Sequence, residues 1–403
     1  MWEQIRSNQI RSAVLVALMG ILLLLVGYFL GLAFGSGVGG LVIALVIWGI
    51  MNLVALFQGD SILLAISGAR KINPGDHPRL FHVVEEMKIA SGLEKMPDVY
   101  IIDDPALNAF ATGRDPNRAS VAITSGLLQK LNRDELQGVI GHEISHIKNR
   151  DVLLMVMLSV LLGSIVILAW YGSRFLIFSG GAGGGRRRSS SGGGGGAALI
   201  ILAVALIFMI LAPIAAQLIY FAVSRKREYL ADASSALYTR YPEGLASALE
   251  KLAMSNTGVQ KANQATAPMY IVNPFQKKAM SVNELTSTHP PIAERVRILR
   301  AMSGASMADY ERAYQSAKGG AHVVPASALA SAMEAKLRPA FADTQPLDEV
   351  AEKVERTRET SDLMWRMSQY RTIDCECGTR LRLPPHYRAP TIRCPHCGRI
   401  NPA

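Results

Sequence analysis

The sequence predicts a mainly α-helical integral membrane protein with a soluble α+β domain and a small cysteine module near its C-terminus. Three observations support this prediction. Four long apolar segments occur along the chain, a polar stretch with short β-like runs separates the second from the third, and all four cysteines fall within residues 375–403. The chain has 403 residues, of which 50% are hydrophobic, and a formal net charge of +10.

The apolar segments are long enough to cross a bilayer. The first pair is Ala13 to Phe34 and Val38 to Phe57, and the second pair is Val152 to Tyr171 and Ala197 to Val223. A helix of about 20 apolar residues spans roughly 30 Å of hydrocarbon, whereas a buried core helix needs a shorter run. The first segment is too long for the apolar region of a signal peptide. We therefore expect an uncleaved anchor and about four membrane helices.

Basic residues gather beside the apolar segments. Two arginines precede the first segment, Arg70 and Lys71 follow the second, and residues 225–227 follow the fourth. Positive residues beside membrane helices favour the cytoplasmic side, so the net charge does not require a nucleic-acid partner. The loop between the third and fourth segments also carries arginines, at 186–188. A shallow hairpin that does not fully cross therefore stays an alternative for this pair.

The polar stretch from Gly68 to Asp151 has the pattern of a small folded domain. It contains three short runs rich in β-forming residues, separated by proline, glycine and asparagine. Such runs with turn residues between them predict a small β meander. The runs are Val99 to Ile102, Ala109 to Thr112 and Ser120 to Thr124.

The next predicted helix carries two histidines one turn apart. Asn132 and Glu135 form a capping-box pattern at its start. His142 and His146 are four residues apart, so both imidazoles stand on one face and can hold one Zn²⁺. The carboxylate of Glu143 can take a proton from a water that the metal activates. This H-E-x-x-H pattern predicts a catalytic zinc site.

The third zinc ligand is predicted just after the fourth apolar segment. A catalytic zinc uses three protein ligands and one open position, and Glu228 supplies the missing carboxylate. Asp232, one turn later, can accept a hydrogen bond from a ligating imidazole. Otherwise these acids would be solvated and paired with Arg225 or Lys226. If Glu228 and His142 share a metal, the chain between them crosses the membrane an even number of times, which two spans or one re-entrant hairpin satisfies.

The cysteines predict a second, structural zinc site. Four thiolates fill a tetrahedral zinc and leave no open position for catalysis. A module of about 30 residues has too little core to fold without such a metal. Two nearby histidines could each replace a cysteine, and a redox dithiol is the weaker alternative because no thioredoxin-like pattern is present. The residues concerned are Cys375, Cys377, Cys394 and Cys397, with His386 and His396 as substitutes.

Four motifs resemble those of the HtpX-type membrane metallopeptidases, which are relatives of the CAAX prenyl proteases. They are the runs Asn73 to Pro78 and Asn108 to Gly113, the motif His142 to His146, and Glu228 to Asp232. The resemblance covers approximately Arg6 to Met302. It implies a Zn²⁺-dependent endopeptidase of the bacterial inner membrane, with its catalytic domain in the cytoplasm, that degrades misfolded or damaged membrane proteins.

The resemblance also implies roles for three residues that spacing alone does not assign. Asn108 lies on a segment that forms an edge strand in the family and pairs with the substrate backbone. His289 matches a position that helps to stabilise the tetrahedral oxyanion, and Arg295 matches a basic position after it. From the residues alone, His289 would be a loop histidine and Arg295 a solvated helix charge.

The sequence thus predicts four parts and one leading function. The parts are a membrane hairpin (1–67), a zincin-type metalloprotease domain (68–303) interrupted by a second hairpin (152–223), a helical spacer (304–371) and a zinc ribbon (372–403). The predicted function is zinc-dependent proteolysis of membrane proteins in quality control, with the ribbon as a docking site. The alternative is a catalytically silent adaptor that binds partners through the ribbon. Cleavage within the bilayer is excluded because charged residues flank the H-E-x-x-H helix.

Overall fold

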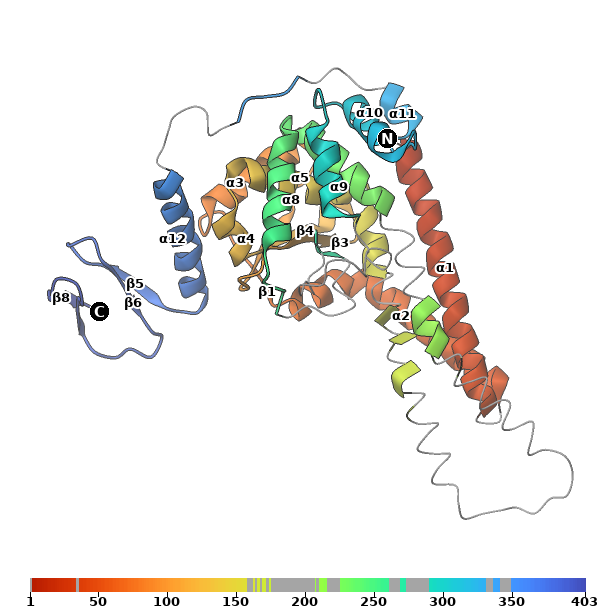
Figure 1. The fold of residues 1–403 in the computed structure, drawn as a ribbon. Helices are drawn as coiled ribbons and strands as arrows, with labels where there is room; N and C mark the ends of the chain where they lie inside the picture. Colours follow the sequence, from red (N-terminus) through yellow and green to blue (C-terminus); the bar gives the residue numbers. More distant parts are fainter. Residues whose placement is uncertain are drawn as a thin grey trace, which may run out of the picture.

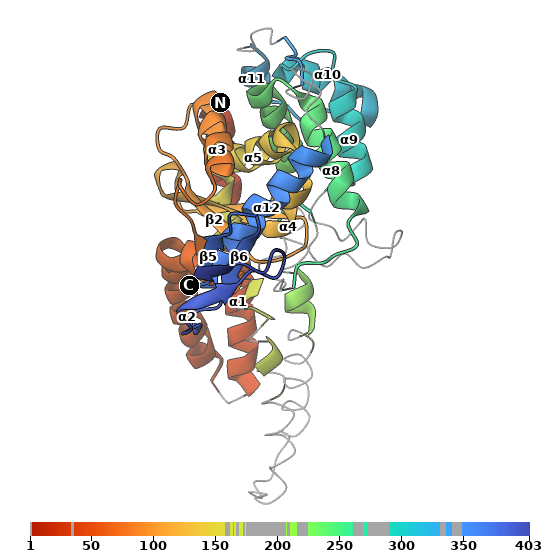
Figure 2. The ribbon, with the colours of Figure 1, turned by 90° about the vertical axis from the view of Figure 1, so that its left-hand side faces the viewer.

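The computed structural model describes residues 2–33, 36–157, 225–260, 269–272, 290–330, 336–340 and 349–403, together with scattered residues between 162 and 215. Two long helices, α1 (Trp2–Ala33) and α2 (Gly37–Ile66), form a hairpin at the edge of a body of shorter helices packed around a small sheet (Figure 1). The view turned by 90° shows the same hairpin extending below the body (Figure 2).

The α1–α2 hairpin is held together by close contacts between small residues. A Cβ added to Gly27 would lie 2.3 Å from the Cβ of Ala44, and one added to Gly40 would lie 2.2 Å from the carbonyl oxygen of Gly27. Helices in membranes often pack in this way because small residues let their backbones approach. Any larger residue at these glycines would push the two helices apart.

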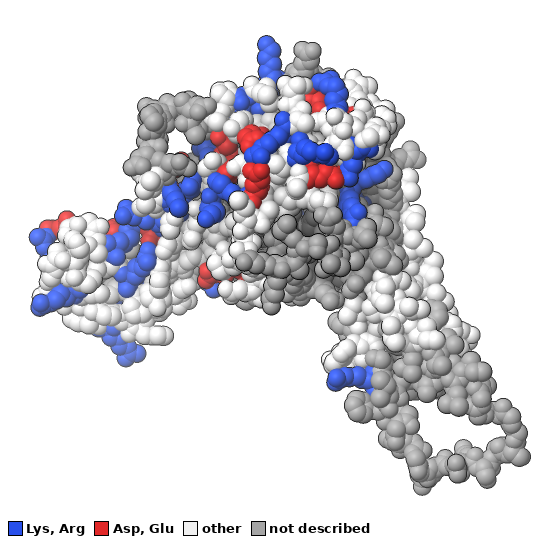
Figure 3. All heavy atoms as spheres, in the orientation of Figure 1, with Lys and Arg blue, Asp and Glu red and all other residues white. Residues whose placement is uncertain are grey.

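The surface of the hairpin suits a hydrocarbon environment. Among the described residues, α2 is the one helix long and apolar enough to cross a membrane, and α1 contains a shorter apolar stretch from Val16 to Leu32. The exposed fractions of Ile43 and Phe57 on α2 are both 62%, and this part of the molecule carries few charges (Figure 3). The third apolar segment falls partly and the fourth largely outside the described residues, so the number of four membrane helices stays a prediction.

The sheet contains four strands in the order β1–β2–β4–β3. All three β-like runs recognised in the sequence are strands, as predicted, and a short strand precedes them. The predicted meander is wrong, however, because β2 and β4 are parallel and adjacent while β3 lies beyond β4 at the edge. The strands are β1 (Ala69–Lys71), β2 (Asp98–Ile102), β3 (Ala109–Gly113) and β4 (Ala119–Thr124).

The loop from β2 to β3 explains this topology. It passes the end of β4, where the hydroxyl of Thr124 donates to the carbonyl of Ala106 at 2.6 Å and lies 2.9 Å from that of Asn108. The chain then turns back along the far side of β4, so every residue of that central strand is buried. A fully buried strand is typical of a parallel pairing. The turn residues in the sequence locate these strands, but they do not decide on which side of β4 the strand β3 pairs.

Helices cover the sheet and provide most of the core. The helix α5 contacts α3, α8 and β3, and it begins with the predicted capping box between Asn132 and Glu135. One large apolar cluster joins these helices to the sheet. The helices are α3 (Pro78–Ser91), α4 (Ser125–Lys130), α5 (Arg133–Lys148), α8 (Pro242–Met254) and α9 (Ile292–Arg300), and a short 3₁₀ turn η1 (Pro116–Arg118) joins β3 to β4.

The C-terminal part is attached to this body. The helix α12 packs on α4, and its Leu363 is 1% exposed within the main core cluster. A guanidinium nitrogen of Arg366 also donates to the carbonyl of Asp76 at 2.9 Å. The predicted spacer therefore contacts the body directly, although the domain boundaries remain predictions. Its helices are α10 (Met307–Lys318), α11 (Ala326–Ala330) and α12 (Glu349–Met367), and they lead to strands β5 (Arg371–Asp374), β6 (Arg380–Leu383), β7 (Thr391–Arg393) and β8 (Ile400–Pro402).

Candidate active site and metal centres

The helix α5 holds the two histidines deep inside the body. Two glycines allow this close packing: a Cβ on Gly138 would lie 2.6 Å from the backbone nitrogen of Leu245, and one on Gly141 would lie 3.1 Å from the hydroxyl of Ser235. The helix thereby packs closely against α8 and against the helical residues 225–239. These two contacts bring the H-E-x-x-H motif next to the predicted carboxylate ligand.

The three predicted ligands of the catalytic metal lie together. The Nε2 atoms of His142 and His146 are 3.3 Å apart, and each is 3.5 Å from a carboxylate oxygen of Glu228. A tetrahedral zinc with bonds of about 2.0–2.1 Å requires its ligand atoms to be about 3.3–3.4 Å apart. The three side chains therefore fit a zinc ion, and a fourth position can be left open.

Each of the two candidate ligand histidines has a carboxylate at its other ring nitrogen. The Nδ1 atom of His142 is 3.0 Å from Asp232, as the sequence predicted, and the Nδ1 atom of His146 is 3.4 Å from Asp151. Such carboxylates fix the orientation of a metal-binding imidazole and increase its basicity. Asp151 was not predicted as a site residue, since in the sequence it only ends the polar stretch, although its place five residues after His146 offered a signal.

The electrostatic environment of this site favours a positive charge. Burial lowers the pKa of His142, but hydrogen bonds that its ring donates to Asp232 and Glu228 outweigh burial and raise that pKa to about 9. A zinc ligand must instead be neutral, so the metal would replace this proton as the positive charge. Burial also raises the pKa of Glu143, despite opposing effects of the two histidines and of the backbone N–H of Ala111. A raised pKa suits a carboxylate that accepts a proton during catalysis.

Arg295 lies directly behind the ligands. Its side chain is fully buried and donates to both carboxylate oxygens of Asp232, at 2.8 and 2.6 Å, while a third nitrogen is 3.6 Å from Glu228. Burial alone would raise the pKa of Asp232, but the charge and hydrogen bonds of Arg295 hold it below its usual value. Arg295 is therefore no solvated helix charge. It contacts Asp232 and Glu228, and Glu228 belongs to the group that could hold a metal.

The two remaining predicted residues differ in what the structure reveals. Asn108 precedes β3, which is an edge strand as the resemblance implied, and its side chain is 2% exposed. His289 lies outside the described residues.

Next to Glu143 and His146 is a small cavity of about 30 Å³. Its apolar walls are formed by Ala111, Val152, Met155 and Met269.

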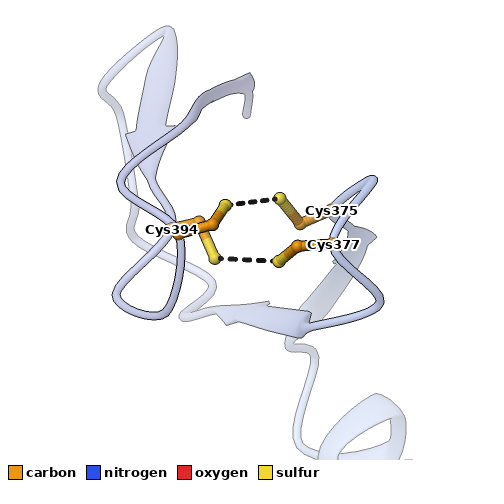
Figure 4. A group of neighbouring side chains, drawn as sticks. Cys375, Cys377 and Cys394 are labelled. Carbon is orange, nitrogen blue, oxygen red and sulfur yellow. Dashed lines mark hydrogen bonds between the residues drawn. The ribbon is translucent and has the colours of Figure 1, made fainter.

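The four cysteines form a second group. The Sγ atoms of Cys375 and Cys397 are 3.6 Å apart, and those of Cys377 and Cys394 are 3.7 Å apart (Figure 4). A disulfide needs about 2.05 Å, whereas a tetrahedral zinc with bonds of about 2.3 Å places its sulfurs about 3.8 Å apart. The cluster thus fits a metal. It is complete without His386 or His396.

The fold and the first site define a metallopeptidase. Comparison with known proteins gives the family: the model of peptidase family M48 matches residues 74–303, and the chain belongs to this family. A protein named Protease HtpX homolog from Dictyoglomus turgidum is 46% identical over 301 residues, which are 75% of this chain and 94% of that protein. A Streptococcus pneumoniae protein of the same name is 45% identical over 303 residues, 75% of this chain and 100% of its own.

A solved structure is also similar. The crystal structure of S. mikatae Ste24p is 20% identical and is matched with a TM-score of 0.39 over 74% of this chain and 67% of the other. The resemblance to HtpX-type metallopeptidases, predicted from four motifs, is confirmed by the family match and the two relatives.

Proposed function

We propose that this metalloprotease is a zinc-dependent endopeptidase that cleaves membrane proteins on the cytoplasmic side of the bacterial inner membrane, as part of protein quality control. The observation that carries the proposal is the group His142, His146 and Glu228, with its atoms at zinc-ligand spacing and Glu143 beside it. A catalytically silent adaptor would not need this set, nor two carboxylates that orient its histidines.

The chain's own residues divide the chemistry between them. Zinc, when bound, would supply the Lewis acid that activates water and polarises the peptide carbonyl. Glu143 takes the proton of the attacking water and can return it to the leaving amine. Asp232 and Asp151 keep both imidazoles in the correct tautomer. The edge strand β3 offers backbone groups with which an extended substrate can pair.

The cytoplasmic side and the membrane substrates are supported by the sequence. Basic residues flank the ends of the apolar segments that lead into the catalytic body, as the positive-inside rule requires for cytoplasmic loops. The body lies close to α2: the guanidinium of Arg114, which follows β3, is 5.6 Å from the ring centre of the exposed Phe57. If α2 spans the membrane, the edge strand lies near the membrane surface, where the exposed parts of membrane proteins can reach it.

The cysteine cluster supports a second zinc, held only for structure. Its four sulfurs leave no position for substrate. We further propose that this ribbon docks protein substrates or partners, since α12 fixes it beside the catalytic body rather than on a free tether (Figure 2).

The test is a comparison of purified wild-type protein with a Glu143→Gln variant. The variant should keep its metal but lose about 10²–10⁴-fold in casein cleavage, because general-base assistance typically contributes that much. Glu94→Gln, at an exposed position on the loop after α3, is the matched control and should cleave normally. Normal cleavage by Glu143→Gln would refute the mechanism. Substrates trapped in cells by this variant would identify the physiological targets.

A further inference from the structure

A short internal segment contacts the edge strand beside the metal ligands. The backbone N–H of Ile271 donates to the carbonyl of Ala109, the first residue of β3, at 3.0 Å. The carbonyl of Ile271 in turn accepts from Arg295 at 3.4 Å. The backbone of Ile271 thus donates one hydrogen bond to the edge strand and accepts another from Arg295 beside the metal site.

The following residue is held through both of its backbone groups. The side-chain amide of Asn108 donates to the carbonyl of Val272 at 3.0 Å, and its oxygen lies 3.5 Å from the N–H of Val272. Four polar groups of two successive residues are therefore recognised by Asn108, Ala109 and Arg295, without any use of their side chains. Recognition of backbone groups at a sheet edge is how proteins bind extended peptides of varied sequence.

The segment also lies where a substrate would be cleaved. Arg295, which holds Ile271, is bonded to Asp232 and lies 3.6 Å from Glu228. Two positions before Ile271, Met269 lines the small cavity that also contains Glu143 and His146. The chain from Met269 to Val272 therefore extends from the cavity beside Glu143 to the start of the edge strand.

Apolar side chains anchor this arrangement. Tyr270 is fully buried, and its ring packs edge-to-face on Phe110 with centroids 5.1 Å apart. Ile271 and Val272 are 1% and 4% exposed. Tyr270 belongs to a small cluster that includes Val259 and residues of the sheet, separate from the ligands of the metal.

We propose that Met269–Val272 is a built-in pseudosubstrate, which occupies the peptide-binding edge of β3 and must leave before a protein substrate can pair there. The proposal rests on the proposed peptidase function and adds its regulation. A competitor within the chain reduces the fraction of enzyme able to bind substrate. The apparent KM therefore rises in inverse proportion to this fraction, while kcat at saturating substrate is unchanged.

The kinetic test is Tyr270→Ala, which removes the anchoring ring but none of the backbone groups at the edge. We expect the KM for a short peptide to fall about tenfold while kcat stays within about twofold of wild type, because the competent fraction rises. Tyr270→Phe keeps the ring and should restore the wild-type KM. Val259→Ala removes apolar volume from the same cluster without touching the edge, so its KM should not change.

A second measurement needs no change in the segment. Hydrogen exchange of residues 269–272 is followed in the Glu143→Gln protein, with and without saturating casein. Displacement of the pseudosubstrate predicts faster exchange at Ile271 and Val272 when casein is bound. Unchanged or slower exchange, or a folded Tyr270→Ala variant with unchanged or higher KM, would show that the segment is a fixed wall of the cleft. Failure of the peptidase function itself would appear separately, as wild-type protein that cleaves no better than Glu143→Gln.

Discussion

The two candidate metal sites of this chain are built in opposite ways. The ligands of the first site stand on helices within the main apolar core, and the least buried of them, His146, has a side chain only 16% exposed. In the second site, Cys377 and Cys397 are exposed, and the apolar cluster around it contains only Leu381 and two isoleucines besides cysteines. The first site lies within the large apolar core of the body. The second must supply the core of its own small module.

This difference separates what each metal does. A buried frame can hold an open coordination position ready for chemistry, since core packing rather than the metal fixes the ligands. A module with almost no core instead gains its folding free energy from metal binding. We therefore expect loss of the first metal to stop catalysis without unfolding the body, and loss of the second to unfold the ribbon without stopping catalysis.

The largest effect should come from removing a ligand of the first site. Glu228→Ala should reduce peptide cleavage to the level of Glu143→Gln, because two histidines alone hold zinc weakly. Metal analysis should then find about one zinc per chain, retained by the cysteines, against about two in Glu143→Gln. A Glu228→Ala protein that kept both metals would show that the carboxylate is no ligand.

A smaller effect is expected at the residues that orient the histidines. Asp151→Asn should weaken zinc binding about 10–100-fold, as is typical when such a hydrogen-bond partner is lost. Zinc affinity measured by competition with a chelator checks this. Asp103→Asn changes an exposed carboxylate in the loop after β2 and should leave the affinity as it was. Equal affinities for both variants would mean that His146 needs no such support.

The junction between the body and the C-terminal module should respond to pH. Burial, assisted by the charge of Arg79, lowers the pKa of His77 from 6.5 to about 4. Between these two pH values His77 is protonated in the unfolded chain but neutral in the folded chain. The contribution of His77 to the free energy of unfolding is therefore fully present above about pH 6.5 and is lost as the pH falls through about 4. The whole change is about 3 kcal/mol, of which roughly half is lost by about pH 5.3.

His77→Asn tests this assignment, because asparagine can replace the N-cap of α3 but cannot titrate. Denaturation midpoints of the variant should change less between about pH 7 and about pH 5 than those of wild type. His82→Asn, at an exposed position of the same helix, should follow wild type. Identical pH profiles for His77→Asn and wild type would mean that a group other than His77 causes the loss of stability.

How far the sequence predicted the molecule depended on the range of each interaction. The histidines one turn apart and the capping box at Asn132 are local features, and the structure contains both. The strands were located, but the parallel pairing of β2 with β4 joins residues more than twenty positions apart and left no local trace. The bond between Arg295 and Asp232 spans 63 positions, so spacing alone suggested a solvated charge. Only the resemblance indicated that this arginine mattered.

The smallest effect should follow from deleting Thr372 to Ala403. Cleavage of a short peptide should stay within about twofold of wild type, since no cysteine contributes to the first site and the core cluster draws only on residues up to Met367. Cleavage of a folded or membrane-bound substrate should fall, because the deletion removes the proposed docking surface while α12 remains on the body. Cys375→Ser tests the same prediction without shortening the chain, because loss of one of the four thiolates is expected to unfold the ribbon. Complete loss of short-peptide cleavage in either variant would mean that the ribbon belongs to the catalytic fold, and that the two sites are not independent after all.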